Sequence, residues 1–538
     1  MISGAEIMVK CLEQEGIDVV FGYPGAAICP FYDALLESSV RHVLVRQEQN
    51  AGHAASGYAR ASGKAGVCVT TSGPGATNLI TAVASAYMDS IPMVAITGQV
   101  STELLGRDVF QEIDITGACE PFTKHSYIVM DTEDLGRVFR EAFHIATTGR
   151  PGPVLIDIPV NIQTKCLESF VYPETVDIVG YKPSRGGHSV QIKRAAQAIQ
   201  AAEKPVICAG GGIFSAKAQK ALIQFAEKTD IPVVCTMMGI GAMPTAHPLN
   251  LGMLGSHGVK AANVAIHQAD LILLCGARVG DRAMASPDQI ASRAKIVHID
   301  IDPAEIGKNM AASIPIVGDI KLVLKSLCDE TETLSHTEWA EQCRKNLRPA
   351  AVATEDTGFV NPKAFMRLLS EKMQDDAILV ADVGQNQIWS ANNFTITKGR
   401  FLTSGGLGTM GYSVGAAIGA KAASPDKQVC AVCGDGSFQM QMMELATMCQ
   451  HDIPVKIIVM RNGRLGMVRE LQFRGYHARY SGVFLEGSPD FIKIAEAYGI
   501  AAKSIHKNSE TEQAIEEMLQ SKTPYLLECV VDPDETAQ

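Results

Sequence analysis

The chain has no long uninterrupted apolar segment and no dense run of lysine or arginine. A membrane-spanning helix needs about 20 mostly apolar residues, and the alanine-rich stretch around 411–423 is shorter and interrupted by glycine. The formal net charge is −11, which gives no general attraction for nucleic acid or for anionic lipid. We therefore expect neither nucleic acid nor a membrane as a partner, whereas the net charge says nothing about a small anionic substrate.

Secretion signals and paired cysteines are missing as well. Residues 1–6 lead directly into a helical pattern instead of a charged and apolar leader. The 14 cysteines are scattered through apolar stretches, and the CxxC spacing at Cys430 and Cys433 has no second pair nearby that would complete a metal site. We expect a cytoplasmic protein in which Cys430 and Cys433 are buried thiols of a strand.

The length and composition indicate several ordinary α/β domains. A single hydrophobic core stops growing well before 538 residues. Short apolar runs that end in Gly or Pro alternate with amphipathic helical stretches, a pattern typical of parallel sheets. We predict an α/β fold of three doubly wound parallel-sheet domains, at 1–165, 188–330 and 360–538, with a loop-like segment between the first two.

The apolar runs also predict where the strands lie. In open α/β sheets, ligands bind beyond the carboxyl ends of the strands, so the loops that follow these runs are where functional residues are expected. The predicted strands are 19–21, 43–45, 66–70, 93–96 and 154–158 in the first domain, 206–209, 233–235, 271–274 and 296–299 in the second, and 377–380, 429–432, 455–459 and 525–529 in the third.

The most specific motif is Gly434-Asp435-Gly436-Ser437, which directly follows a predicted strand, with Asn462 after the next strand. A lone Gly-Asp-Gly is usually a turn. Here the strand context and the second polar loop favour a binding site, because a carboxylate, an amide oxygen and a main-chain carbonyl are ligands for a hard cation beside a diphosphate. The pattern therefore indicates Mg²⁺.

With these residues the sequence resembles the thiamine diphosphate enzyme family, whose cofactor motif is Gly-Asp-Gly followed at a distance by Asn. The resemblance implies that Asp435, Asn462 and the main-chain carbonyl of Arg464 hold Mg²⁺. The family usually has Asn or Asp before that Asn, where this chain has Arg461. This difference removes no ligand.

The family's second hallmark is a glutamate at a strand end in the first domain, and Glu48 follows the predicted strand 43–45. In isolation, such a Glu is more often a residue of the first turn of a helix. Together with the Gly-Asp-Gly motif, the resemblance implies that Glu48 bonds the aminopyrimidine N1′ and promotes removal of the thiazolium C2 proton.

Four further blocks, 89–99, 108–112, 149–154 and 406–411, make the chain similar to the acetolactate synthases over nearly its whole length. The resemblance implies that the bulky Met410 supports the bent cofactor, whereas core packing is the alternative reading of this side chain. Residues expected to contact thiamine diphosphate are Pro24, Gly25, Gly73, Gly384, Gln385, Gly408, Met410, Gly434, Gly436, Ser437 and Met467.

The middle domain carries glycine-rich and charged segments that acetolactate synthases use to bind FAD. Three glycines after a strand usually form a tight turn, but they also let a backbone approach a pyrophosphate. The relatives' Arg-Phe-Asp-Asp-Arg is replaced by Arg278-Val279-Gly280-Asp281-Arg282. By this resemblance FAD is expected at Gly210, Gly211, Gly212, Arg278 and Asp302, without a redox role in the net reaction.

The reaction that the resemblance implies is a carboligation. Pyruvate is decarboxylated, and its two-carbon hydroxyethyl unit condenses with a second 2-oxo acid to give 2-acetolactate. Arg282 is expected to bind the acceptor carboxylate, while Phe110 and Gln111 line the reacting centre. Glu48 and the Gly-Asp-Gly loop lie in different domains, and related enzymes place the cofactor between such domains of two chains. The resemblance therefore implies a homodimer or homotetramer.

Some alternatives stay open at the level of sequence. A related carboligase that uses glyoxylate or sulfoacetaldehyde, and a flavin-linked pyruvate oxidase, would share most of these motifs. The sequence also leaves open whether a regulatory small subunit binds, and whether the pathway is branched-chain amino-acid biosynthesis or fermentation. Two departures from the family pattern concern the acceptor: Leu471 stands where relatives have Trp, and Val160 where they have Lys.

Overall fold

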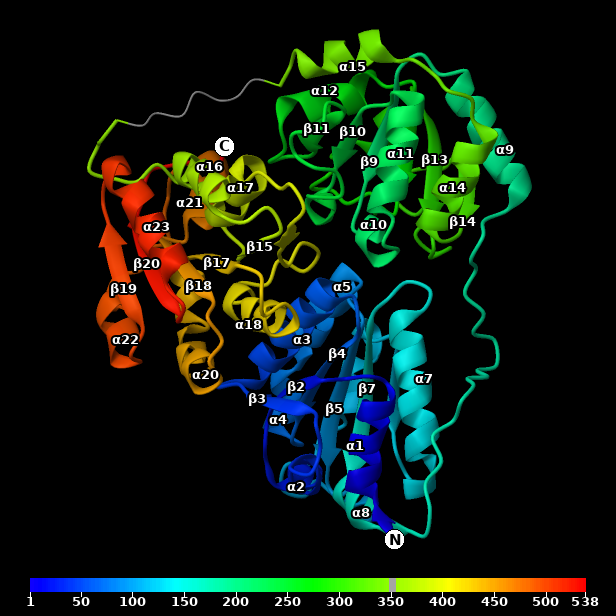
Figure 1. The fold of residues 1–538 in the computed structure, drawn as a ribbon, viewed down its shortest axis with the longest axis vertical. Helices are drawn as coiled ribbons and strands as arrows, with labels where there is room; N and C mark the ends of the chain where they lie inside the picture. The colour runs from blue at the N-terminus through cyan, green and yellow to red at the C-terminus, as the bar shows by residue number, and fades with distance from the viewer. Residues whose placement is uncertain (348–354) are drawn as a thin grey trace.

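The computed structural model describes residues 1–347 and 355–538, which form three α/β units in succession along the chain (Figure 1). Each unit contains a six-stranded parallel sheet with helices packed on its faces. The predicted fold class is therefore confirmed. The sheets lie within the ranges predicted for the three domains, whose exact boundaries stay a proposal. Among the helices of the described residues, none is long and apolar enough to cross a membrane.

The first sheet has the strand order β3-β2-β4-β5-β7-β6. A small antiparallel pair, β1 with β8, closes the unit. The strands are β1 (Ile2–Ser3), β2 (Val19–Tyr23), β3 (Arg41–Leu44), β4 (Gly66–Thr70), β5 (Met93–Gln99), β6 (His125–Ile128), β7 (Pro153–Pro159) and β8 (Cys166–Leu167), and the α-helices are α1 (Gly4–Gln14), α2 (Cys29–Leu35), α3 (Glu48–Ser62), α4 (Pro74–Asn78), α5 (Ile80–Asp89), α6 (Ile115–Cys119), α7 (Leu135–Thr147) and α8 (Val160–Thr164).

The second sheet has the order β11-β10-β9-β12-β13-β14. Its strands are β9 (Pro205–Ala209), β10 (Val233–Cys235), β11 (Asn250–Met253), β12 (Leu271–Cys275), β13 (Lys295–Asp300) and β14 (Ile314–Val317), and its α-helices are α9 (Ser189–Gln200), α10 (Gly212–Ser215), α11 (Gln219–Thr229), α12 (Lys260–Gln268), α13 (Pro287–Ala291), α14 (Ile320–Glu330) and α15 (Thr337–Arg344).

The third sheet has the order β16-β15-β17-β18-β20-β19. Cys430 and Cys433 are completely buried in its strand β17, as predicted. The strands are β15 (Ile378–Ala381), β16 (Arg400–Leu402), β17 (Val429–Gly434), β18 (Lys456–Arg461), β19 (Ala501–Ile505) and β20 (Tyr525–Val530), and the α-helices are α16 (Pro362–Lys372), α17 (Gln385–Asn393), α18 (Ser413–Ala423), α19 (Asp435–Gln439), α20 (Leu445–Gln450), α21 (Gly466–Gly475), α22 (Phe491–Ala497) and α23 (Thr511–Gln520).

The first and third units meet where α3 packs against α18 (Figure 1). Both helices are rich in alanine and glycine along the contact. A Cβ at Gly57 would overlap the carbonyl of Ala416, and one at Gly419 would overlap the carbonyl of Ala54. The two backbones therefore approach each other at positions where only glycine fits. Since α3 begins at Glu48, this contact fixes the orientation of the helix that carries Glu48.

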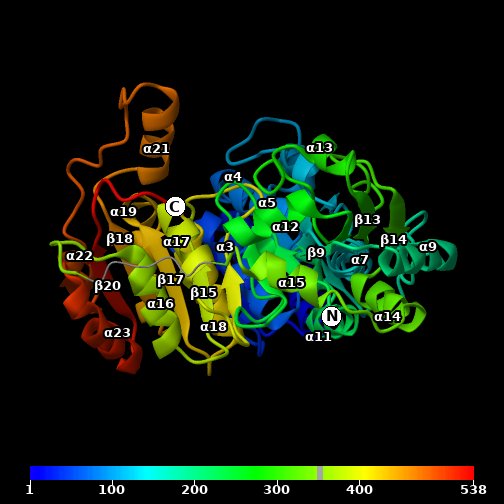
Figure 2. The same cartoon turned by 90° about the horizontal axis from the view of Figure 1, so that it is seen from above.

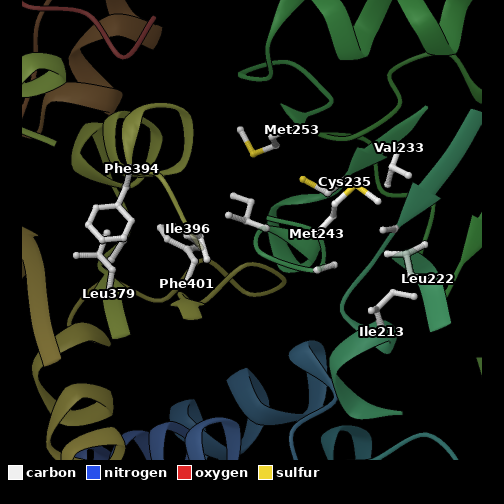
Figure 3. Close-up of a cluster of buried hydrophobic side chains, with 14 of the residues drawn as sticks. Ile213, Leu222, Val233, Cys235, Met243, Met253, Leu379, Phe394, Ile396 and Phe401 are labelled. Carbon is white, nitrogen blue, oxygen red and sulfur yellow. The ribbon is translucent and has the colours of Figure 1, made fainter. Parts of the chain in front are cut away.

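The second and third units share one hydrophobic cluster, part of which Figure 3 shows. Phe394 and Ile396 come from the third unit, while Met243 and Met253 come from the second. The main chains also bond directly, since the N–H of Thr245 donates to the carbonyl of Ile396 at 2.8 Å. These contacts place the loops of the second sheet beside the third unit.

Candidate active site

The Gly-Asp-Gly loop leaves the carboxyl end of β17, next to the loop that follows β18. Gly434 ends β17 and pairs with Met460 of β18. Because these strands are parallel neighbours, Asp435 and Asn462 leave the sheet at the same edge. Asp435 is buried, and its Oδ2 accepts the backbone N–H of Gly463 at 2.6 Å. The two loops that carry the predicted metal ligands are thus in direct contact.

The oxygen atoms at this contact are of the kind that a hard cation binds. Burial raises the pKa of Asp435 to about 6, although the N–H groups of Gly463 and Gly436 act in the opposite direction. The Oδ1 of Asn462 accepts the N–H of Arg464 at 3.0 Å and so faces the loop. A bound divalent cation would offset the burial of the Asp435 charge, so the donor set fits Mg²⁺.

Gln385 begins α17 and reaches the same edge of the sheet. Its Nε2 donates to Glu470 Oε1 at 2.6 Å and to the carbonyl of Glu535 at 2.7 Å. Its Oε1 accepts from Asn462 Nδ2 at 3.0 Å. Both polar hydrogens of the Gln385 amide are therefore used by the protein. The side chain supports the metal loop and has no N–H group left for a diphosphate, so a contact to that group would come from its main chain.

Met410, predicted to support the cofactor, lies beside the Gly-Asp-Gly loop. A Cβ at Gly436 would lie 2.8 Å from Leu465 Cδ2 and 3.7 Å from Met410 Cε, so these groups line one space over the loop. Ser437 is buried behind it, and its hydroxyl donates to the carbonyl of Gly434 at 3.2 Å. Leu465 is an apolar wall that sequence reasoning did not single out.

Asp382 is a second residue that sequence reasoning missed. It is completely buried directly after β15 and accepts the N–H groups of Gly411 at 3.0 Å and Ser413 at 2.8 Å, and the amide of Gln441 at 2.9 Å. Burial raises the pKa of this carboxyl, and its bonds to Ser413 and Gly411 lower it. Asp382 thus fixes the chain immediately after Met410. Its place after an apolar run was the available signal, the same rule that identified Asp435.

Glu48 is the first residue of α3, at the carboxyl edge of the first sheet. Its Oε2 accepts Asn78 Nδ2 at 2.9 Å. Its Oε1 has no hydrogen-bond donor among the described residues and lies 3.5 Å from the position of a Cβ on Gly75. Pro24 and Gly25 follow β2 at the same edge. One carboxylate oxygen of Glu48 is therefore held by the protein, and the other is available to a ligand.

The loop that carries Phe110 and Gln111 lies against Gly73. A Cβ at Gly73, whose φ is +59°, would come within 2.9 Å of Gln111 Cα. Glu112 closes the loop on itself and accepts the N–H of Val109 at 3.2 Å. Phe110 is 85% exposed, although phenylalanine side chains are usually buried. This ring has no cover within the described part of the chain.

A cavity of about 1280 Å³ lies where the three units meet. It is larger than the roughly 300–1,000 Å³ of ordinary small-molecule sites. The predicted residues that line it are Gly211, Gly212, Arg278, Arg282, Gly408 and Met467. Glu48, Phe110 and Gln111 are not among its lining residues. In the single chain the predicted site residues therefore form two separate groups, one at the edge of the first sheet and the other around the metal loop and this cavity.

The carboxylate that reaches the cavity from β13 is Asp300 rather than the predicted Asp302. Asp300 lines the cavity, and burial raises its pKa to about 6. Asp302 does not line it and pairs with Arg150 at 3.2 Å. Gly210 is also outside the lining, and a Cβ there would overlap the carbonyl of Gly276. Gly210 therefore lets two loops pack closely behind the cavity wall.

One end of the cavity carries two arginines, each beside an acidic residue: Arg282 lies 3.6 Å from Asp281, and Arg474 lies 3.1 Å from Glu470. The guanidinium of Arg282 is 80% exposed and comes from the second unit, while Leu471 and Arg474 come from α21, which projects from the third unit (Figure 2). The pKa of His257 is lowered by burial, raised by Glu470, and lowered by Arg282 and Arg474, so these groups face one another. Arg282 is the most exposed of these cations, and its pair with Asp281 is long, so its guanidinium can still meet a carboxylate.

Comparisons with known proteins agree along the whole chain. The family model for the N-terminal binding domain of thiamine pyrophosphate enzymes matches residues 2–118, the model for their central domain matches 192–327, and the model for their C-terminal binding domain matches 382–529.

Individual relatives narrow the family further. A probable acetolactate synthase large subunit of Methanocaldococcus jannaschii is 48% identical over 99% of this chain and 93% of the relative. The chain belongs to the acetolactate synthase family. An acetolactate synthase large subunit of Corynebacterium glutamicum is 46% identical, with 99% and 87% covered, and an acetolactate synthase of Arthrospira platensis is 43% identical, with 99% and 95% covered. The resemblance inferred from sequence motifs is thus confirmed.

Proposed function

We propose that this chain catalyses the carboligation of its family: pyruvate loses CO₂, and the remaining two-carbon unit is joined to a second 2-oxo acid. With two pyruvates the products are 2-acetolactate and CO₂. The observation that carries the proposal is the contact between the Asp435 and Asn462 loops in a chain whose relatives are acetolactate synthases. Mass spectrometry of the products formed from pyruvate, with and without 2-oxobutyrate, tests it. Absence of acetolactate from pyruvate alone would favour a related carboligase that uses glyoxylate or sulfoacetaldehyde.

The proposed cofactor is thiamine diphosphate with Mg²⁺. When bound, it supplies a nucleophilic carbon and accepts the electron pair that departing CO₂ leaves behind. Asp435, Asn462 and the carbonyl of Arg464 would hold the metal. Main-chain groups of Gly384 and Gln385, together with the Gly434–Ser437 loop, would approach the diphosphate. Asp435→Ala removes the anionic ligand, so calorimetry should detect no Mg²⁺-dependent binding of thiamine diphosphate; unchanged affinity would contradict the assignment.

Within this site Glu48 would exchange a proton with the aminopyrimidine N1′ through Oε1, while Asn78 holds Oε2. Arg282 would bind the acceptor carboxylate at the end of the cavity where its exposed guanidinium lies. Met410 and Leu465 would exclude water above the metal loop. These roles are supported by the free Oε1 of Glu48, by the exposure of the Arg282 guanidinium and by the packing around Gly436.

We infer that the competent unit is a homodimer, alone or within a homotetramer, with the cofactor between the first unit of one chain and the third unit of the other. The separation of Glu48, Phe110 and Gln111 from the cavity supports this, as does the exposed ring of Phe110.

Mixed dimers of two inactive variants, Glu48→Gln and Asp435→Ala, test the arrangement. If the cofactor lies between chains, each mixed dimer contains one site with both residues intact, and activity returns on co-expression. If each site is built from one chain, no mixed dimer has an intact site and activity stays absent.

We also propose that FAD occupies the large cavity, without a redox change in the reaction. Three features support a dinucleotide there. The cavity is large, its wall has no side chains at Gly211 and Gly212, and Arg278 and Asp300 lie nearby. Anaerobic photoreduction of the flavin should leave acetolactate formation largely intact. Bleaching of the flavin by pyruvate under argon would instead favour a pyruvate oxidase.

A regulatory small subunit and a place in branched-chain amino-acid biosynthesis are further proposals. Two of the relatives are named large subunits, which supports a second, smaller subunit. Purification of the chain from its own cells should then yield a smaller protein at fixed stoichiometry. Purification of the chain alone, with full activity, would contradict this.

A further inference from the structure

The Gln385 amide has an orientation that its neighbours determine by chemistry alone. One terminal atom of this amide lies 2.6 Å from a carboxylate oxygen of Glu470 and 2.7 Å from the carbonyl oxygen of Glu535. A main-chain carbonyl oxygen and a carboxylate oxygen only accept hydrogen bonds. The atom between them must therefore be the nitrogen, and the amide oxygen must point the other way.

That oxygen determines the orientation of the next amide. Gln385 Oε1 lies 3.0 Å from Asn462, so the Asn462 atom that meets it must be the donor Nδ2. Asn462 Oδ1 then points away from Gln385. The N–H of Arg464, which can only donate, meets this Oδ1 at 3.0 Å and so requires the same orientation of Asn462. Glu470, Gln385 and Asn462 thus form a hydrogen-bonded relay.

The relay is also enclosed. Gln385 and Glu470 are both buried, 5% and 8% exposed. A Cβ on Gly466 would overlap Gln385 Oε1, so the glycine at the start of α21 leaves room for this amide. The Oε1 of Glu470 that accepts from Gln385 also accepts the N–H of Ala537 at 2.8 Å. These contacts leave the two amides little freedom to rotate.

We propose that Glu470 is a positioning residue for the metal site: through Gln385 it holds the Asn462 amide with Oδ1 toward the metal. The inference rests on the proposed function, because Asn462 is a metal ligand only if the cofactor site is the one proposed. It assigns the Gln385 side chain to support of the metal ligand rather than to the diphosphate. Residues that orient metal ligands typically change metal affinity about 10- to 100-fold when they are removed.

The test compares two substitutions at one position. Glu470→Leu removes the acceptor and leaves Gln385 free to rotate. Glu470→Gln keeps an oxygen toward Gln385 and turns its NH₂ toward Arg474, so it loses only the ion pair with that residue, which is 3.1 Å long. Arg474→Met removes the same ion pair from the other side and serves as the matched control. All variants are full-length, and circular dichroism verifies that they fold.

The readout is the affinity for Mn²⁺ at saturating thiamine diphosphate, measured by electron paramagnetic resonance of the free ion. We expect Glu470→Leu to weaken Mn²⁺ binding about tenfold or more, and Glu470→Gln and Arg474→Met to stay within about twofold of the unsubstituted chain. Unchanged binding in Glu470→Leu would overturn the proposal. Equal weakening in Glu470→Leu and Glu470→Gln would also overturn it, since the effect would then come from charge rather than from amide orientation.

Two further variants separate the relay from other effects. Gln385→Met breaks the relay without touching Glu470 and should weaken Mn²⁺ binding as Glu470→Leu does; a wild-type affinity would contradict the proposal. Lys363→Met removes bonds of 3.0 Å and 2.9 Å to Glu535 and Gln538, and so tests whether loosening the C-terminal segment alone is sufficient. An equal loss in Lys363→Met would overturn the relay. If the unsubstituted chain itself shows no metal-dependent cofactor binding, the proposed function has failed instead.

Discussion

The buried carboxylate of Glu444 accepts the side-chain amide of Asn50 at 3.0 Å, across the contact between the third and first units. It also accepts the backbone N–H groups of Arg46 at 3.0 Å and Gln47 at 3.2 Å. Because α3 begins at Glu48, this carboxylate lies at the helix N-terminus, where free N–H groups favour an anion. The third unit therefore holds the start of the helix that carries Glu48.

Glu444→Ala should lower the melting temperature by several degrees. The substitution leaves the N–H groups of Arg46 and Gln47 and the Asn50 amide without their acceptor, and an unsatisfied buried donor costs about 1 to 3 kcal/mol. Glu444→Gln keeps one oxygen in place and should have a smaller effect. Differential scanning calorimetry of both variants is the measurement. A Glu444→Ala chain that melts like the unsubstituted one would show that these bonds contribute nothing net.

Glu48→Gln should keep the fold and slow the exchange of the thiazolium C2 proton of bound thiamine diphosphate. An amide can still accept from Asn78, but it cannot share a proton with N1′ as a carboxylic acid does. General acid–base assistance is typically worth about 10² to 10⁴-fold, and NMR of hydrogen–deuterium exchange at C2 measures the loss. An unchanged melting temperature is the control. Exchange and turnover at the normal rate would remove Glu48 from this role.

The central strands could be predicted from sequence, whereas most of the edge strands could not. A central strand such as β17 is buried on both faces, so it is a continuous apolar run. The strands of the three large sheets that were not predicted, β6, β11, β14, β16 and β19, all lie at an edge of their sheet. β6 has the sequence His-Ser-Tyr-Ile with no fully buried position, and its pairing with β7 depends on residues far away in the chain.

The same limit applies to the site. The rule that ligands bind in the loops after strand ends uses only neighbouring residues in the sequence, so it could indicate Asp435, Asn462 and Glu48. The partners that fix these residues could not be found in this way, since Glu470 meets Gln385 only after two distant helices pack together. Asp302, the residue predicted to bind FAD, lies two positions beyond Asp300, which ends β13 and lines the cavity. Residues two apart in an extended chain share a face, so alternation does not distinguish these two carboxylates.

Asp157 should make the stability of the first unit depend on pH near neutrality. It is buried in β7 and accepts from Thr97 at 2.7 Å and Gln99 at 2.9 Å. Burial raises its pKa to about 7, against an ordinary value near 4. The folded chain therefore binds this proton more tightly than the unfolded chain does. The resulting stabilisation is fully present below about pH 4 and is lost as the pH rises toward 7.

Asp157→Asn should flatten that dependence. Asparagine stays neutral, accepts from Gln99 with its oxygen, and donates to the hydroxyl of Thr97. A shift of three pKa units corresponds to about 4 kcal/mol at most, so we expect the gain in melting temperature to be largest at pH 8 and clearly smaller at pH 5. Calorimetry of both chains between pH 5 and pH 8 measures the difference. Parallel melting curves at all pH values would show that Asp157 titrates normally.

The acceptor preference should depend on Leu471, which lies on the projecting helix α21 and is 58% exposed in the single chain. It lines the same cavity as Arg282, the residue proposed to bind the acceptor carboxylate. In acetolactate synthases a tryptophan at this position is expected to pack on the extra methyl group of 2-oxobutyrate. Leucine offers a smaller apolar surface to that group.

One methylene in an apolar pocket gives about 1 to 3 kcal/mol of discrimination, roughly 10- to 200-fold, so loss of the aromatic wall removes much of the preference for the larger acceptor. We therefore expect acetolactate to dominate in an equimolar mixture of pyruvate and 2-oxobutyrate, and Leu471→Trp to raise the ratio of acetohydroxybutyrate to acetolactate.

Val160→Lys is the matched control, because Val160 begins α8 and does not line the cavity. An added cation there should lower the Michaelis constant for anionic substrates without changing the ratio of the two products. A strong preference for 2-oxobutyrate in the unsubstituted chain, or a ratio unchanged by Leu471→Trp, would show that Leu471 does not contact the acceptor.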